Sequence, residues 1–212
     1  MKKLMVVFCI VLLTLPLTSL AEEEPILPAL RERKTLHSSY NPDAFVPEDI
    51  ITRILTAAFS MPTGGGQFYV VTDRGIMAAM RGGNPWSQAL ETCPCVIVVA
   101  ADESLAFYPE LQEMDAGLAS GAILAQATAE GLTTCVLSIA PQQERIRSVR
   151  EALQMPDTIT PVMMIAMGYP VADAVSSASV DGWNDGQVYW FNSQENSELH
   201  QLSDLLQANE ET

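Results

Sequence analysis

The chain has 212 residues, 48% of them hydrophobic, and its 11 Lys and Arg against 26 Asp and Glu give a formal net charge of −15. This length and apolar fraction suit one domain with a sizeable core. The acid excess argues against nucleic acid and anionic membranes as partners, because phosphate surfaces are bound by clustered Lys and Arg, and the last of these is Arg150.

The first 21 residues have the parts of a secretory signal peptide. Lys2 and Lys3 form a basic head, residues 4–17 are apolar, and a small-x-small sequence ends at Ala21. The apolar run is shorter than the roughly 20 residues of a spanning helix, so we expect cleavage and no membrane anchor. The mature chain would be periplasmic or secreted, with nine Lys or Arg against 26 acids and a net charge of −17.

Residues 22–30 form an acidic lead, and residues 31–212 the predicted domain. Cys93, Cys95 and Cys135 remain after cleavage, an odd number that does not suit a disulfide framework. Cys93 and Cys95 stand two residues apart where a strand is expected to begin, so they are expected on one face of it. We expect buried, structural thiols; a thiol redox site is the alternative. The chain lacks the ligand spacing of a metal site.

Helical and strand patterns alternate along the chain. Helices are predicted at residues 47–58, 115–130 and 142–153, and again after Ser197, a capping residue. Strands are predicted at residues 68–71, 95–100, 133–137, 161–167 and 187–191. By itself the alternation favours a parallel βαβ sheet. No glycine-rich phosphate fingerprint opens a helix, so the common nucleotide-binding folds are not indicated.

Local signals support the helix boundaries. Pro47 suits a first turn, and the acids that follow it, Glu48 and Asp49, favour the positive end of a helix. Gly131 is a typical stop after the long helix. That helix places small and apolar residues on one face, namely Leu118, Ala122, Ala125 and Ala129. Its small residues permit close packing against another helix.

The strongest chemical signal is Arg33-Lys34-Thr35-Leu36-His37, followed later by Met61-Pro62-Thr63-Gly64-Gly65-Gly66. Cations and a hydroxyl near a glycine-rich turn are able to hold a phosphorylated cofactor. The glycine turn is a weak motif alone, since it runs into a strand instead of a helix. For Arg33 and Lys34 the alternative is a solvated helix face.

Taken in order, several segments resemble the nitroreductase family of flavin enzymes. Arg33 to His37 is similar to its Arg-Arg-Ser-x-Arg, and Met61 to Gly65 to its Ala-Pro-Ser/Thr turn. Residues 131–135 resemble its Gly-Leu-Gly-Thr-Cys strand, and residues 168–170 its terminal Gly-Tyr-Pro. The resemblance implies an α+β fold, a three-layer α/β/α arrangement with a central, mainly antiparallel sheet flanked by helices. It also implies an intertwined homodimer, and it replaces the parallel sheet as our prediction.

The resemblance further implies FMN as cofactor and ping-pong chemistry, in which NAD(P)H reduces the flavin and the flavin reduces a nitro compound, quinone or similar small acceptor. Carried over by position, Arg33, Lys34 and His37 would meet the phosphate, with Thr35 at the flavin's polar edge. The remaining predicted cofactor-binding residues are Thr63, Gly64 and Gly65, which would line the site, and Leu137 and Ser138, whose backbone would face the ring. No catalytic side chain is assigned.

The sequence departs from the family's pattern at three places. Gly66-Gln67 runs directly into a strand without the usual Asn-containing segment, and Ser120-Gly121 replaces a polar pair of the long helix. Residues 171–212 contain no Lys or Arg to complete the phosphate clamp, and His37, unlike arginine, is not permanently charged. The alternative function is therefore a flavin-deficient binding protein of the same fold without redox activity. The electron donor of an exported enzyme stays open.

Overall fold

The computed structural model describes residues 27–62 and 64–178. The predicted signal peptide, most of the acidic lead, Thr63, the strand at 187–191 and the helix after Ser197 lie outside these ranges. Within the described residues, no helix has both the length and the apolar composition needed to cross a bilayer.

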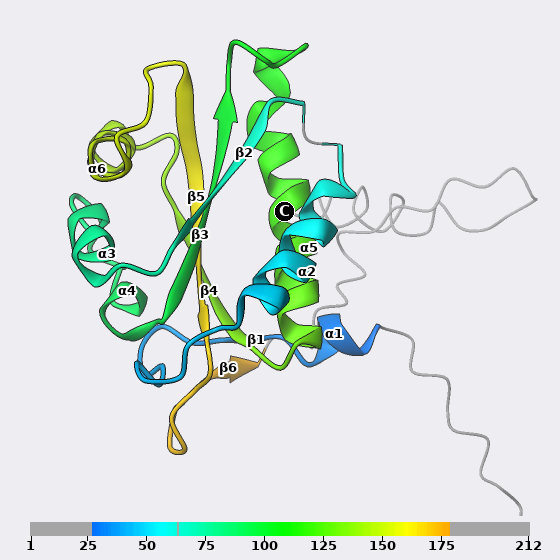
Figure 1. Cartoon of the computed structure of the whole chain (residues 1–212), viewed down its shortest axis with the longest axis vertical. Coiled ribbons are helices and arrows are strands. Elements are labelled where there is room, and N and C mark those ends of the chain that lie inside the picture. The colour runs from blue at the N-terminus through cyan, green and yellow to red at the C-terminus, as the bar shows by residue number, and fades with distance from the viewer. Residues whose placement is uncertain (1–26, 63, 179–212) are drawn as a thin grey trace, which may run out of the picture.

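The described strands form one sheet in the order β2-β3-β5-β4-β1-β6 (Figure 1). They are β1 (Lys34–Thr35), β2 (Gly66–Val71), β3 (Cys95–Asp102), β4 (Thr133–Ser138), β5 (Ile159–Gly168) and β6 (Ser177–Ala178). The pair β1 and β4 is parallel, and every other neighbouring pair is antiparallel. The mainly antiparallel sheet implied by the resemblance is confirmed, and the parallel sheet suggested by alternation alone is wrong.

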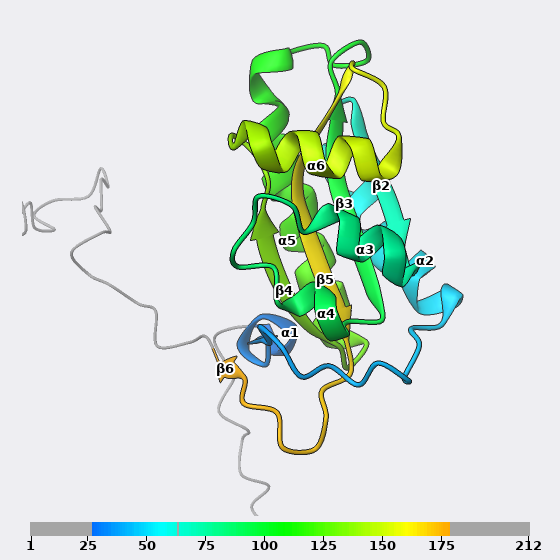
Figure 2. The same cartoon turned by 90° about the vertical axis from the view of Figure 1, so that its left-hand side faces the viewer.

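Helices cover both faces of the sheet and complete the three layers (Figures 1 and 2). On one face lie α2 (Glu48–Phe59) and α5 (Gln112–Ala129), and short α1 (Pro28–Arg31) contacts α5. On the other lie α3 (Arg74–Met80), α4 (Ala89–Thr92) and α6 (Gln143–Leu153); a 3-10 turn, Pro109–Leu111, precedes α5. The three predicted helices that lie within the described residues are confirmed to within three residues, whereas α1, α3 and α4 were not predicted.

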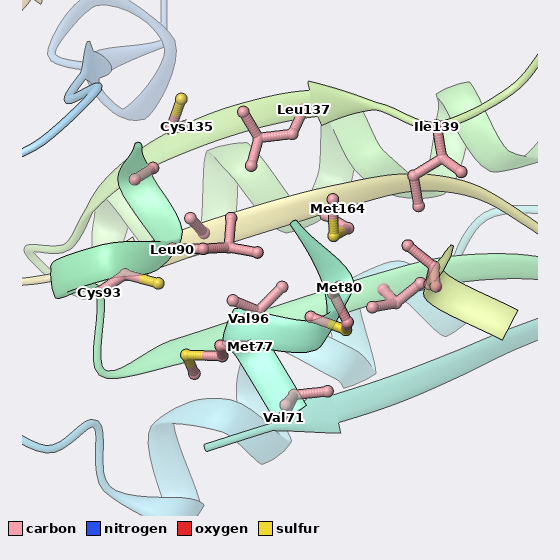
Figure 3. Close-up of a cluster of buried hydrophobic side chains, with 14 of the residues drawn as sticks. Val71, Met77, Met80, Leu90, Cys93, Val96, Cys135, Leu137, Ile139 and Met164 are labelled. Atoms are coloured by element: carbon pink, nitrogen blue, oxygen red, sulfur yellow. The ribbon is translucent and has the colours of Figure 1, made fainter. Parts of the chain in front are cut away.

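Each face of the sheet has its own core. Alternate residues of β3 point to opposite faces: Ile97 and Val99 contact the α2/α5 layer, while Val96 and Val98 contact the α3/α4/α6 layer. Figure 3 shows the second cluster, where side chains of α3, β3, β4 and β5 meet. Because β3 is covered on both faces, it is a continuous apolar run instead of an alternating one.

The cysteines are buried, as predicted, but the predicted shared face of two of them is wrong. Cys93 belongs to the core under α3, α4 and α6, whereas Cys95 belongs to the core under α2 and α5. The reason is local: α4 ends at Thr92 and β3 begins only at Cys95, so strand alternation does not extend back to Cys93. All three described cysteines are free.

Helix α5 has two apolar sides. Its inner side includes Ala116, Ala119 and Ile123, all buried against the sheet and α2. The opposite side carries Leu118, which is 44% exposed and belongs to the small-residue face noted in the sequence. The outward side of this 18-residue helix therefore leaves apolar side chains exposed in a single chain.

Candidate functional site

The motif at Arg33 lies beside the start of β4. Thr35 pairs with Thr134 in the parallel β1/β4 ladder, and Arg33 Nη1 donates a hydrogen bond to Thr35 Oγ1 at 2.9 Å. Because that oxygen accepts from Arg33, its own hydrogen can be donated to a ligand. Thr134 Oγ1 is buried and has no hydrogen-bond partner among the described residues. One cation and two hydroxyls therefore gather at this corner of the sheet.

An uncovered strip of β4 extends from this corner. β1 ends at Thr35, so the edge of β4 beyond Thr134 lacks a neighbouring strand among the described residues. On the face of β4 that carries Thr134, the next two side chains are Val136, 43% exposed, and Ser138, also exposed. Four residues of strand span about 13 Å. The strip combines an apolar surface with polar groups at both ends.

Two predicted phosphate ligands lie elsewhere. Lys34 lines an open hollow of about 520 Å³ together with Glu32, Thr133, Pro170 and Val171. His37 has its Nδ1 3.5 Å from the Sγ of Cys135, whose side chain is in the core under α3, α4 and α6, on the opposite face of β4 from Thr134. The structure thus brings Arg33 and Thr35 together but turns Lys34 and His37 to other surroundings.

The glycine turn is at the far corner of the sheet. Gly66 pairs with Ala101 at the end of β3, and three strands separate β2 from β1. Ala101 pairs with Thr160 of β5, and Thr35 is aligned through Thr134 with Met167 of β5, seven residues further along that strand. Strand spacing and this offset together place Gly64 and Gly65 roughly 30 Å from Thr35. Thr63 lies outside the described residues. One chain therefore does not bring both predicted halves of the site together.

Backbone conformation and packing account for glycine at position 65 without any ligand. Its φ is +84°, and a Cβ there would lie 2.8 Å from the carbonyl oxygen of Asp102. Beside the turn, Gly64, Gln112 and Asp115 line a cavity of about 10 Å³, room for about one water molecule. Gln112 Nε2 is buried without a partner among the described residues. This hollow is too small for a cofactor.

At the other end of the β4 strip, Leu137 and Ser138 differ in orientation. Leu137 is buried in the core under α3, α4 and α6, so only its backbone can face a ligand. Ser138 accepts hydrogen bonds from Arg145 Nη1 at its carbonyl oxygen, 3.0 Å, and at Oγ, 3.1 Å. Arg145 was not identified from the sequence, and neither were Thr134 and Val136.

The thiols are poor candidates for chemistry. Burial raises the pKa of Cys93 and of Cys95 to about 12, and that of Cys135 to about 11. Thiolates, the reactive form, are therefore scarce near neutral pH. No group of three or more His, Cys, Asp or Glu in the described part of the chain is placed to hold a metal ion.

Comparison with known proteins agrees with this architecture. Residues 80–169 match the model of the nitroreductase family. A protein of Archaeoglobus fulgidus, provisionally named NADH dehydrogenase/NAD(P)H nitroreductase, is 29% identical over 152 residues, 69% of this chain and 87% of that protein. The chain is thus similar to the nitroreductase family in sequence and in architecture. The solved relatives described next connect this family with FMN.

Two solved nitroreductase-family structures show the likeness in three dimensions. The FMN-dependent nitroreductase of Clostridium difficile R20291 is 25% identical, with a TM-score of 0.67 over 79% of this chain and 99% of that one. A protein of Desulfovibrio desulfuricans, provisionally named a nitroreductase and solved with FMN, is 24% identical, with a TM-score of 0.59 over 74% of this chain and 93% of that one. At 24% identity, the similarity to the Desulfovibrio desulfuricans protein is evidence for the fold alone.

The residues of the β4 strip fit the chemistry of FMN. A guanidinium and two hydroxyls at Arg33, Thr35 and Thr134 match a phosphate, which prefers charge-assisted donors. The exposed Val136 offers an apolar surface to a planar ring, and Ser138 offers polar groups beyond it. The fit covers one half of the predicted site, because the glycine turn lies at the opposite corner.

Proposed function

We propose that this chain is an exported, FMN-dependent oxidoreductase that reduces a nitro, quinone or similar small acceptor by ping-pong chemistry. The observation that carries the proposal is the uncovered β4 strip, with Arg33, Thr35 and Thr134 at one end and Ser138 at the other. Hydroxyls without a hydrogen-bond partner beside an exposed apolar strand lower the stability of the fold, and a bound ligand could satisfy them.

The chain's own residues would bind and orient the cofactor. Arg33 and the Thr35 hydroxyl hold the phosphate, and the buried Thr134 hydroxyl gains the partner that it lacks. Val136 supports the ring, while the backbone at Leu137 and Ser138 faces its polar edge. When bound, FMN supplies the electron-transfer chemistry. NAD(P)H is the proposed donor, in line with the name of the Archaeoglobus fulgidus relative.

A homodimer would complete the site. The exposed, apolar side of α5 suits a second copy, and Gly117 and Gly121 leave open space where a neighbouring backbone can approach. The Gly64–Gly65 turn is roughly 30 Å from Thr35 in one chain, so it can line a site with Thr35 only if it comes from another copy. Thr63 would come with it.

A second candidate, a flavin-deficient binding protein of the same fold, is favoured by one observation. Lys34 lines a separate hollow and His37 lies beside Cys135. Among the described residues of the motif, Arg33 is therefore the one cation whose side chain bonds to the Thr35 hydroxyl. Each charge-assisted bond to a phosphate is worth about 1.5 to 3 kcal/mol. Loss of two such bonds lowers the affinity for FMN by a factor of a hundred or more, by the relation of about 1.4 kcal/mol per factor of ten.

A flavin titration of the purified mature protein separates these candidates. We expect a flavin absorbance near ~450 nm that survives dialysis, and a melting temperature that rises with added FMN. Arg33→Ala should weaken FMN binding by about ten- to a hundredfold, through loss of one charge-assisted contact. Arg147→Ala, an exposed arginine of α6, is the matched control and should change nothing. A colourless protein with no FMN-dependent melting shift overturns the enzyme in favour of the binding protein.

Export has its own test. Cell fractionation with N-terminal sequencing should find a mature chain that begins at Glu22 in the periplasm or the medium. A full-length chain in the cytoplasm overturns this part of the proposal and leaves the flavin site unaffected.

A further inference from the structure

Arg145 joins the first turn of α6 to the end of the β4 strip. Its Nη1 donates to both the carbonyl oxygen and the Oγ of Ser138, at 3.0 and 3.1 Å. Two hydrogen bonds from one nitrogen fix the guanidinium beside the strand. Its Nε and Nη2 make no hydrogen bond to any other residue in the part of the chain that the structure describes. The side chain is half-buried, so these donors are held in place and still reachable.

The fold gains little from a cation at this position. Arg145 is the third residue of α6, near the positive end of the helix, where a positive charge is unfavourable. Among the described residues, the ion pairs are those of Arg31, Arg53 and Arg81, so no carboxylate neutralises Arg145. The adjacent Glu144 does not, because its side chain lies over Gly83. Arg74 and Arg150 also lack carboxylate partners but use two guanidinium nitrogens each on backbone carbonyls, whereas Arg145 uses Nη1 alone and keeps Nε and Nη2 for an anionic ligand.

We propose that Arg145 is a specificity-determining residue that binds a carboxylate, or a similar anionic group, on the acceptor molecule. The inference rests on the proposed function, since it places the acceptor at the Ser138 end of the β4 strip, where the flavin ring is expected. Nε and Nη2 lie on one edge of the guanidinium plane and can hold both oxygens of a carboxylate. Acceptors with a carboxylate are therefore preferred over neutral acceptors with the same reducible group.

Binding of two matched probes tests the assignment. 4-Nitrobenzoate and 4-nitrobenzamide have the same nitroaromatic ring and differ in charge, and their dissociation constants for the FMN-saturated protein can be measured by calorimetry. We expect wild type to bind the benzoate about tenfold more tightly, as one charge-assisted contact implies. Arg145→Gln should abolish that preference and leave the benzamide unchanged. Arg145→Lys, which keeps the charge, should restore part of it.

Arg147→Gln is the control, because this exposed arginine is on the same helix and makes no hydrogen bond or ion pair with β4 in the described structure. A benzoate preference that persists in Arg145→Gln overturns the assignment. An equal loss of both probes does too, because it points to damage at Ser138; circular dichroism of the variant shows whether it is folded. If the protein takes up no FMN, the proposed function fails separately, and the same titration without flavin still decides the role of Arg145.

Discussion

The two faces of the sheet are completed in different ways. Under α3, α4 and α6 the core is closed within one chain, and Met77 and Met80 are 0% exposed. Under α2 and α5 the inner core is equally well packed, but α5 is apolar on its outer side as well, with Met114 56% exposed. Next to it, Val136 leaves a strip of β4 uncovered. One face is closed by the chain itself, and the other leaves apolar side chains exposed in a single chain, where the proposed homodimer would cover them.

This difference separates the residues that make the fold from those proposed to bind the cofactor. The closed face contains Met77, Met80 and two cysteines; of the predicted cofactor ligands it has the backbone of Leu137 and His37, which lies against Cys135. The open face contains Arg33, Thr35 and the exposed part of β4. Predictions that compare matched substitutions on the two faces can test the separation.

The largest effect is expected in the closed core. Met80→Ala removes a fully buried side chain and should lower the free energy of unfolding by about 2 to 5 kcal/mol, at any protein concentration. Met114→Ala, the same change on the outer side of α5, should cost less than about 0.5 kcal/mol where the chain is monomeric. Urea unfolding of both variants measures the contrast. Equal losses would mean that the outer side of α5 is packed within a single chain.

The next effect is on assembly. Leu118→Glu places a charge on the outer side of α5, and we expect the dimer to weaken by about a hundredfold and FMN to be lost with it, because an unpaired charge is costly to bury. Analytical ultracentrifugation measures the change. Trp86→Glu is the control, since Trp86 is 70% exposed in the loop before α4, on the closed face. An unchanged mass for Leu118→Glu would exclude α5 from the interface.

Most of the fold could be predicted from local pattern, because helix and strand periods are local properties. The elements around 47–58, 95–100 and 133–137 are confirmed, whereas strand direction depends on non-local pairing and came only from the family resemblance. Helix α3 was missed because it has only seven residues and contains Gly75. Its one clear signal is Asp73, whose side chain accepts a hydrogen bond from the backbone of Ile76.

Less of the site could be predicted. The pair Arg33 and Thr35 follows from the motif, since alternate strand residues share a face. Arg145 and Val136 could not be found in the same way, because their importance depends on where β1 ends and on which edge of β4 stays open. The separation of Thr35 from Gly65 follows from strand order, which the sequence does not state.

A smaller effect is expected for a substitution of Gly121 on the outer side of α5. A Cβ at Gly121 would meet nothing within 4 Å, so Gly121→Ala should stabilise the isolated chain by about 1 kcal/mol through helix propensity. If a second copy packs closely there, the same methyl group weakens the dimer. Melting temperatures at low and high protein concentration separate the two contributions. A gain that is the same at both concentrations would argue against close packing at Gly121.

The smallest effect is expected at the salt bridge between Arg53 of α2 and Glu130 at the end of α5. Arg53 donates to both carboxylate oxygens of Glu130 at 2.8 Å, and this hydrogen bonding, with a smaller contribution from Gln126, lowers the pKa of Glu130 from 4.5 to about 2. Since the folded-state pKa is the lower one, the stabilisation is complete above about pH 4.5 and is lost as the pH falls toward 2.

Arg53→Met should therefore flatten the acid limb of the stability curve between pH 4.5 and 2, with Asp49, whose pKa the same arginine lowers, adding to the change. Urea midpoints at several pH values measure it, and Arg147→Met should keep the limb of the wild type. The guanidinium is about half exposed, so the change should stay well below that of Met80→Ala. An acid limb identical in Arg53→Met and wild type would mean that the α2/α5 layer is held by its apolar contacts alone.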